Sequence, residues 1–268
     1  MMEALRRYPL VAYFVLAYLL TWWVYPLLRF SPFLGFFGLL GPALAAIIMA
    51  AALDGRSGVK DLLGRLVRWR VGARWYLIAL AVPALLAFLA AGLNIALGGA
   101  TTFQFGTLTI FEFVIFALVV GEELGWRGYA LPRLLEQRSA LAASLILGVL
   151  WGLWHVPTFL VPGTPQYGKP FIAFVLMTIA YSVLITWIFV HTKGSVLIAT
   201  LVHGAINFFH GVFLGGVEPT RQYWLMAAVY GAAAIVLAVV LGPSLRGRRT
   251  IRPERRAPVY RDGDRSVR

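Results

Sequence analysis

The 268-residue chain contains no cysteine. Its absence excludes disulfide bonds, thiolate metal ligands, a cysteine nucleophile and S-acylation. Charged residues are also scarce, at 13% of the chain, and acids are the rarer sign, with 11 Asp and Glu against 24 Lys and Arg. A soluble protein of this length does not combine so few charges with 60% hydrophobic residues, so the composition indicates a polytopic membrane protein.

Several sequence patterns are missing as well. The chain has no internal repeat, no Gly-rich phosphate loop, no Ser-x-x-Lys pair and no His-Glu-x-x-His helix. Without the last of these, any metal ion would need ligands gathered from separate helices. No polar linker is long enough to separate two domains, so one compact helical domain is expected.

Long hydrophobic runs in the sequence indicate the fold class. About 20 apolar residues cross the hydrocarbon core as a helix, and by this measure residues 1–242 form a single all-α domain of about eight transmembrane helices in one bundle. The predicted spans are 9–28, 33–53, 75–97, 107–124, 140–161, 170–191, 196–215 and 222–242. Residues 243–268, rich in Arg and Pro, are predicted to be a basic, disordered cytoplasmic tail that fixes topology without a specific partner.

The basic residues are distributed unevenly among the segments between these spans. Starting from a cytoplasmic N-terminus, 21 of the 24 lie on the cytoplasmic side, and only Arg29, Lys169 and Arg221 lie on the other. The positive-inside rule therefore predicts a multi-pass protein of the cell membrane with both termini cytoplasmic. This placement explains the net charge of +13 without a nucleic-acid partner.

Residues 54–74 place leucines and valine beside lysine and arginines. The pattern predicts an amphipathic helix in contact with anionic lipid headgroups. A plain solvated basic loop is the alternative for the part after Trp69.

The predicted span 107–124 ends in two adjacent carboxylates, Glu122 and Glu123. Glu123 and Arg127 are four residues apart on one helix face and are spaced for an ion pair, whereas the side chain of Glu122 points about 100° away. We therefore expect Glu123 and Arg127 to support the structure and Glu122 to act as a general base toward water. Alternatively, all three belong to a salt-bridge cluster at the cytoplasmic end of the span.

Two histidines and an amide lie in other apolar segments. Trp151 precedes His155 by one helical turn and can form a wall beside its imidazole, although a lone His in a span often only bonds a neighbouring helix. His203 and Asn207 share a helix face. Together they can stabilise an oxyanion, or serve as a metal ligand and the residue that orients it.

A carboxylate pair, a histidine and a His-x-x-x-Asn pair on three spans suit a hydrolase that activates water. The motifs Glu122-Glu123-x-x-x-Arg127, Trp151-x-x-x-His155 and His203-x-x-x-Asn207 resemble those of the CAAX prenyl protease and bacteriocin-processing (CPBP, or Abi) intramembrane proteases, over about residues 107–215. Phe is more usual in that family where Trp151 stands, a difference expected to change pocket shape more than chemistry.

The resemblance implies an endopeptidase that cuts a protein or peptide near its C-terminus or in a membrane segment, with lipid modification of the substrate left open. Glu122 with His155 would activate water, and His203 with Asn207 would stabilise the oxyanion. Glu123 and Arg127 would support the site. Because Glu122 ends its predicted span, we expect access from the cytoplasmic side.

The cofactor and two other functions stay open at this stage. The family is commonly labelled metalloprotease, yet a metal-free glutamate mechanism is also argued for it. A divalent ion such as zinc, if bound, would take Glu122, His155 and His203 as ligands. Buried Glu and His also suit a proton-coupled transporter, although no repeated half supports one. A non-enzymatic membrane adaptor or immunity protein would keep the motifs for packing alone.

Overall fold

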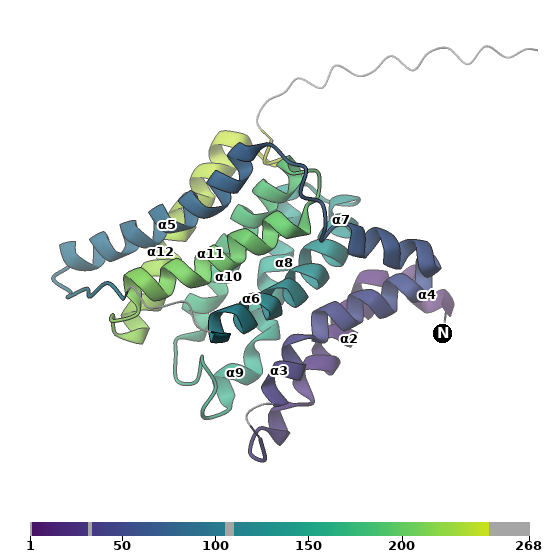
Figure 1. Cartoon of the computed structure of the whole chain (residues 1–268), viewed down its shortest axis with the longest axis horizontal. Coiled ribbons are helices and arrows are strands. Elements are labelled where there is room, and N and C mark those ends of the chain that lie inside the picture. The colour runs from purple at the N-terminus through teal and green to yellow at the C-terminus, as the bar shows by residue number, and fades with distance from the viewer. Residues whose placement is uncertain (1, 32–33, 105–109, 247–268) are drawn as a thin grey trace, which may run out of the picture.

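The computed structural model describes residues 2–31, 34–104 and 110–246, and throughout these ranges it contains helices but no strand. The helices form one bundle (Figure 1). The α-helices are α1 (Met2–Arg7), α2 (Pro9–Trp22), α3 (Leu34–Leu39), α4 (Gly41–Gly64), α5 (Ala73–Ala96), α6 (Ile110–Glu123), α7 (Leu131–Leu135), α8 (Ala140–Trp154), α9 (Val156–Leu160), α10 (Phe171–His191), α11 (Val196–Leu214) and α12 (Pro219–Leu241). A 3-10 helix, η1 (Tyr25–Leu27), and a π-helix, η2 (Leu124–Ala130), complete the set.

Six helical segments in the described ranges are long and apolar enough to cross a membrane. They are Pro9–Leu27, Leu34–Gly64, Ala73–Ala96, Phe171–His191, Val196–Leu214 and Pro219–Leu241. The apolar helix α8 is shorter, with 15 residues, and α6 begins beside residues that the structure does not describe. The all-α, multi-pass class is confirmed, while the count of eight spans and the side of the termini stay predictions.

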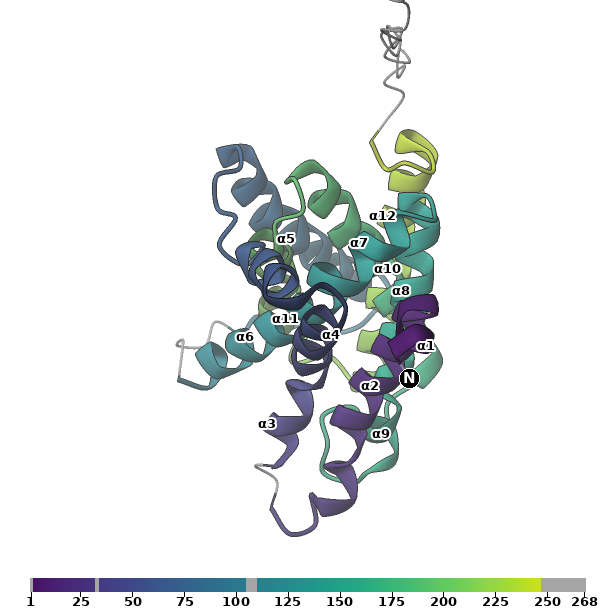
Figure 2. The same cartoon turned by 90° about the vertical axis from the view of Figure 1, so that its right-hand side faces the viewer.

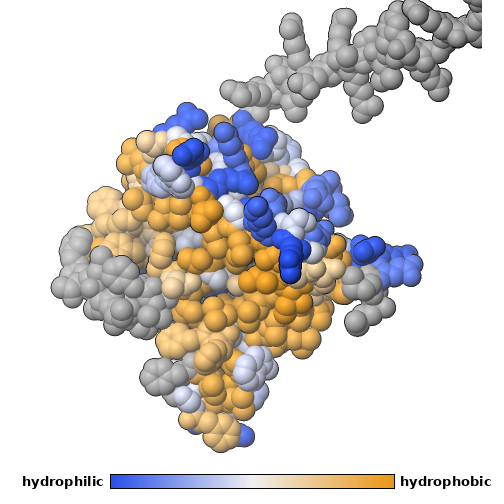
Figure 3. Space-filling model, turned by 45° about the vertical axis from the view of Figure 1, so that its right-hand side comes forward, coloured by the Kyte–Doolittle hydropathy of each residue, from blue (hydrophilic) through white to orange (hydrophobic). Residues whose placement is uncertain are grey.

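Four segments that the charge distribution predicts to be cytoplasmic meet at one end of the bundle. This end is called the basic end (residues 54–74, 136–139, 192–195 and 242–246). Ser195 Oγ donates to the Arg68 carbonyl at 2.7 Å, and Arg133 pairs with Asp54 at 2.9 Å. Figure 3 shows hydrophilic residues gathered over the upper part of the molecule, above a broad hydrophobic surface. The other end (residues 23–31, 97–104, 155–170 and 215–218) is called the opposite end.

The helix that carries the paired carboxylates does not end at residue 124. It continues as η2 and then α7, so Glu122 lies well inside the bundle, roughly 20 Å of helix from the next loop. Arg127, which the charge distribution assigned to a cytoplasmic loop, is fully buried, and that assignment is wrong. Burial is tolerated because Glu123 Oε1 lies 2.7 Å from Arg127 Nη1 and neutralises the charge.

The predicted span 140–161 is two helices separated at His155. The Ser139 side chain accepts a hydrogen bond from the Ala142 amide and caps the start of α8. Pro157 has no amide hydrogen, so the regular helical ladder is interrupted where α9 begins. The break places His155 at the end of a helix.

Glycines let α8 approach α10 closely. A Cβ atom on Gly148 would lie 2.5 Å from the Ile179 Cα, and one on Gly152 would lie 2.8 Å from the Thr178 hydroxyl oxygen. Small residues allow this kind of contact between membrane helices. The end of α8, with Trp151 and His155, is thereby held against α10.

The basic segment 54–74 is helical only in its first half. Gly55 adopts φ 62°, which kinks α4, and the helix then continues to Gly64 and is followed by turns. Leu62 is buried, whereas Val67 is 72% exposed. The helix prediction is therefore confirmed only as far as Gly64, and contact with anionic lipids stays a prediction.

The predicted tail begins with packed residues. The Pro243 carbonyl accepts from the Leu141 amide at 2.9 Å, and the Leu245 side chain is fully buried. These contacts join residues 243–246 to the start of α8. The rest of the predicted disordered tail, 247–268, lies outside the described residues.

Candidate active site

One cavity of about 450 Å³ brings together the candidate residues from three helices. Glu122 comes from α6, Trp151 and His155 from the end of α8, and His203 and Asn207 from α11. These segments are far apart in the sequence. Their convergence is the geometric condition that hydrolytic chemistry requires.

Trp151 holds the Glu122 carboxylate and also contacts His155. Its indole Nε1 donates to Glu122 Oε2 at 2.9 Å, and its backbone carbonyl lies 3.0 Å from His155 Nδ1. When Nδ1 donates to this carbonyl, the other imidazole nitrogen, Nε2, is left as an acceptor. Trp151 therefore does more than shape the pocket, because it fixes the direction of the carboxylate.

Glu123 makes a separate set of contacts. Its Oε1 accepts from Arg127 Nη1 at 2.7 Å and lies 2.9 Å from His203 Nδ1. All three side chains are buried, and the Arg127 guanidinium lies 4.8 Å from the Trp151 ring centroid. The two adjacent acids thus have different partners, as the spacing along the helix predicts.

Asn207 is one turn beyond His203 on α11 and lines the same cavity. Its side chain is exposed, whereas His203 is buried. Gly204 lies between them, and a Cβ atom there would lie 2.8 Å from the Phe116 ring. The close approach of α6 and α11 at this glycine brings the His203 face toward Glu122.

The cavity lies on the side of the bundle away from the basic end. Its outer walls include Tyr25, Gly35 and the segment 162–166, which belong to α3 and the opposite end, and none of its lining residues comes from the basic-end loops. In both views, α3 and α9 project from the same end of the bundle (Figures 1 and 2). Access from the cytoplasmic side stays a prediction, because it depends on the orientation of the bundle in the membrane.

Other residues that line the cavity were not identified from the sequence. Phe174 packs with its ring centroid 4.8 Å from that of His155, and Thr178 and Tyr181 follow on the same face of α10. Gln166 lines the cavity from the loop between α9 and α10. Apolar and weakly polar residues are so common in this chain that no sequence signal separates these from the rest.

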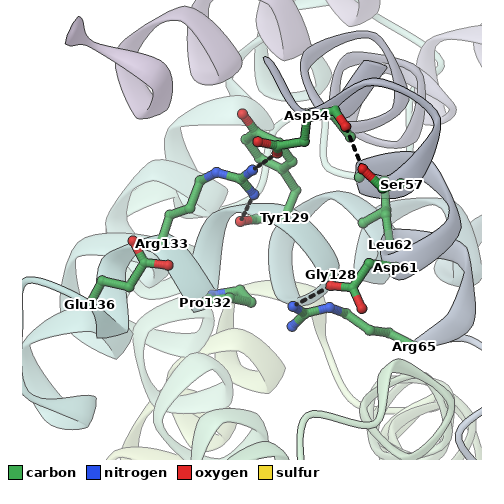
Figure 4. Close-up of a pocket in the computed structure, with 12 residues that line it drawn as sticks. Asp54, Ser57, Asp61, Leu62, Arg65, Gly128, Tyr129, Pro132, Arg133 and Glu136 are labelled. Atoms are coloured by element: carbon green, nitrogen blue, oxygen red, sulfur yellow. Dashed lines mark hydrogen bonds and ion pairs between the residues drawn. The ribbon is translucent and has the colours of Figure 1, made fainter. Parts of the chain in front are cut away.

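A second cavity, of about 530 Å³, lies near the basic end (Figure 4). Its acids are largely committed to arginines, since Asp61 pairs with Arg65 at 3.2 Å and Asp54 pairs with Arg133. Figure 4 shows the two pairs on opposite sides of the cavity. None of the candidate catalytic residues lines it.

The candidate metal ligands do not form a metal site as they are arranged here. Across the residues that the structure describes, no three His, Asp or Glu side chains are grouped closely enough to hold an ion. Trp151 already occupies one oxygen of Glu122. A set made of Glu122, His155 and His203 therefore does not fit this geometry.

Comparison with known proteins gives consistent matches. The family model for type II CAAX prenyl endopeptidase Rce1-like proteins matches residues 103–209, which include every candidate catalytic residue. CAAX prenyl protease 2 of the archaeon Methanococcus maripaludis is 31% identical over 217 residues, which cover 75% of this chain and 79% of that protein.

Proposed function

This chain belongs to the type II CAAX prenyl endopeptidases, and from that membership we propose that its Glu122 cavity hydrolyses a peptide bond near the C-terminus of a protein substrate. The chain is accordingly a multi-pass membrane endopeptidase. The observation that carries the finer proposal is the meeting of Glu122, His155, His203 and Asn207 around one cavity inside the bundle.

In the first step, Glu122 and His155 activate a water molecule. Trp151 occupies Glu122 Oε2, so Oε1 is the oxygen that accepts the proton of the water. The water oxygen then forms a bond to the carbonyl carbon of the substrate. General-base assistance of this kind contributes about 10²- to 10⁴-fold to the rate.

In the second step, the carbonyl oxygen becomes negatively charged and needs hydrogen-bond donors. Asn207 donates through its amide. His203 Nδ1 faces Glu123, so this ring donates to the oxyanion through Nε2 when it carries both protons. The proton on Glu122 passes to the leaving amine as the carbon–nitrogen bond breaks, which yields an amine and a carboxylic acid that then releases its proton to water.

The cavity walls favour an apolar substrate segment. Leu118 and Val119 of α6 and Phe36 and Leu39 of α3 line the cavity. Such walls accommodate apolar side chains or a prenyl group by excluding water from them. The proposed substrate is therefore a C-terminal protein tail that is apolar or lipid-modified.

The test is cleavage of matched peptides, prenylated and unprenylated, by the protein in lipid vesicles. Glu122→Gln should lower the rate at least 100-fold, because the base is lost while the side-chain shape is kept. Glu136→Gln is the matched control, since Glu136 lies outside this cavity. Full cleavage by Glu122→Gln would contradict the mechanism, whereas the absence of any cleavage by the wild type would favour the transporter and adaptor interpretations.

Metal dependence needs a direct measurement. The steps above use only the side chains of this protein, so activity should survive removal of metal ions with a chelator. Metal analysis of the purified wild type, His155→Ala and His203→Ala provides a second test. Stoichiometric metal that is lost in both variants would show that the donors rearrange to bind an ion.

A further inference from the structure

A tail cut near its C-terminus carries its own carboxylate toward a cavity that already holds Glu122. Because the proposed substrate end is anionic, it needs a cation to offset both the loss of water and the charge of Glu122. The described residues that line the cavity include no Lys or Arg. The cation must therefore lie at the edge of the cavity.

Lys169 lies in the loop between α9 and α10, and residues 162–166 of this loop line the cavity. The Lys169 amide donates to the Gln166 carbonyl at 3.0 Å, and Gln166 lines the cavity. The Lys169 ammonium lies 5.3 Å from the Tyr223 ring centroid. Among the described residues, no carboxylate lies within ion-pair distance of Lys169.

The loop that contains Lys169 also holds a polar atom without a partner, because Gln166 Oε1 is buried and makes no hydrogen bond. Partial burial lowers the pKa of Lys169, as expected for an amine that lacks an anion.

The distance from Lys169 to the catalytic histidine suits a short tail. The Tyr223 ring stacks on Phe174 with centroids 6.1 Å apart, and Phe174 packs 4.8 Å from the His155 ring. Together with the step from Lys169 to Tyr223, these contacts limit the separation of Lys169 and His155 to about 16 Å. An extended tail of three or four residues spans roughly 10–13 Å, and the lysine side chain is long and flexible.

We propose that Lys169 binds the C-terminal carboxylate of the substrate and so sets how far from the chain end cleavage occurs. The proposal rests on the proposed function and adds a recognition element to it. Lys169 is the best-placed cation of the opposite end, because Arg221 donates to the carbonyls of Asn94 and Leu97 and Arg29 lies over the Phe30 ring.

The experiment measures binding, so that it does not depend on turnover. The Glu122→Gln protein in lipid nanodiscs is titrated with a fluorescent peptide that ends either in a free carboxylate or in a carboxamide. The free acid should bind about tenfold more tightly, as expected for a charged hydrogen bond at a partly exposed site. Adding Lys169→Gln should abolish that preference, while Lys169→Arg should preserve it.

Arg29→Gln is the matched control, because it removes a cation from the same end and should leave the preference unchanged. Equal binding of acid and amide by the Glu122→Gln protein, or an undiminished preference after Lys169→Gln, would overturn the proposal. An equal loss of affinity for both peptides would also overturn it, since it would indicate damage to the loop. Failure of the proposed function is separate, because it would appear as cleavage by Glu122→Gln.

Discussion

Replacing Arg127 by methionine separates the structural acid from the working acid. Arg127 and Glu123 are fully buried and 2.7 Å apart, so the variant leaves a carboxylate inside the bundle without its cation. Breaking a buried pair in this way costs about 3–5 kcal/mol. For a chain of this size, the loss corresponds to a fall of roughly 6–20 °C in the midpoint of thermal unfolding.

Two further variants make this prediction specific. Glu123→Gln combined with Arg127→Met removes both charges and should recover most of the lost stability, because a neutral pair does not carry the desolvation penalty. Glu122→Gln should change stability by less than about 1 kcal/mol, because the new amide oxygen still accepts from Trp151. It should nevertheless abolish most activity.

The assay is thermal unfolding of the purified proteins in detergent, followed by tryptophan fluorescence. A midpoint for Arg127→Met within 2–3 °C of the wild type, well below the fall expected for a broken buried pair, would refute the reasoning. A double variant as unstable as the single one would also refute it, because the cost would then come from lost packing against Trp151 and not from an unpaired charge.

Three other predictions follow from the site and its supports. Asn207→Ala should lower kcat roughly 100-fold with little change in KM, because the amide acts on the oxyanion, and a matching rise in KM would contradict that role. Gly148→Ala should cost roughly 1–3 kcal/mol in thermal unfolding, since its Cβ would meet the backbone of α10, whereas Gly92→Ala, in open space on α5, should be neutral or stabilising. The chain has no native cysteine, so an impermeant maleimide can report which side of the membrane an introduced cysteine faces. Val67→Cys should react from the cytoplasmic face and Tyr167→Cys from the other face. Labelling of both from one face would refute the predicted topology.

The local geometry of the acids could be predicted from spacing alone. Residues four apart on a helix share a face, which links Glu123 to Arg127, and adjacent residues diverge, which frees Glu122. The cluster of His155, His203 and Asn207 needed more than spacing. Their chemical types suggested a shared site, but only the close packing of α6, α8 and α11 brings them to one cavity.

The depth of the site could not be predicted in the same way. An arginine after an apolar run normally marks the end of a span, because a lone cation in the hydrocarbon core is costly. Here the pairing with Glu123 removes that cost, and the helix continues as η2 through Arg127. The predicted end of this span at residue 124 is therefore about three helical turns short of the end of α7 at Leu135.

The contacts of Trp151 predict what an exchange to phenylalanine at this position would do. A phenyl ring has no N–H group, so the Trp151→Phe protein must orient Glu122 by another donor or leave its carboxylate free to turn. In this chain the indole N–H of Trp151 restrains the Glu122 carboxylate, and the face of the indole lies beside Arg127. The backbone carbonyl of Trp151 contacts the His155 ring. An aromatic exchange to phenylalanine at residue 151 would keep the backbone carbonyl beside His155 and a ring face beside Arg127, and would release the Glu122 carboxylate alone.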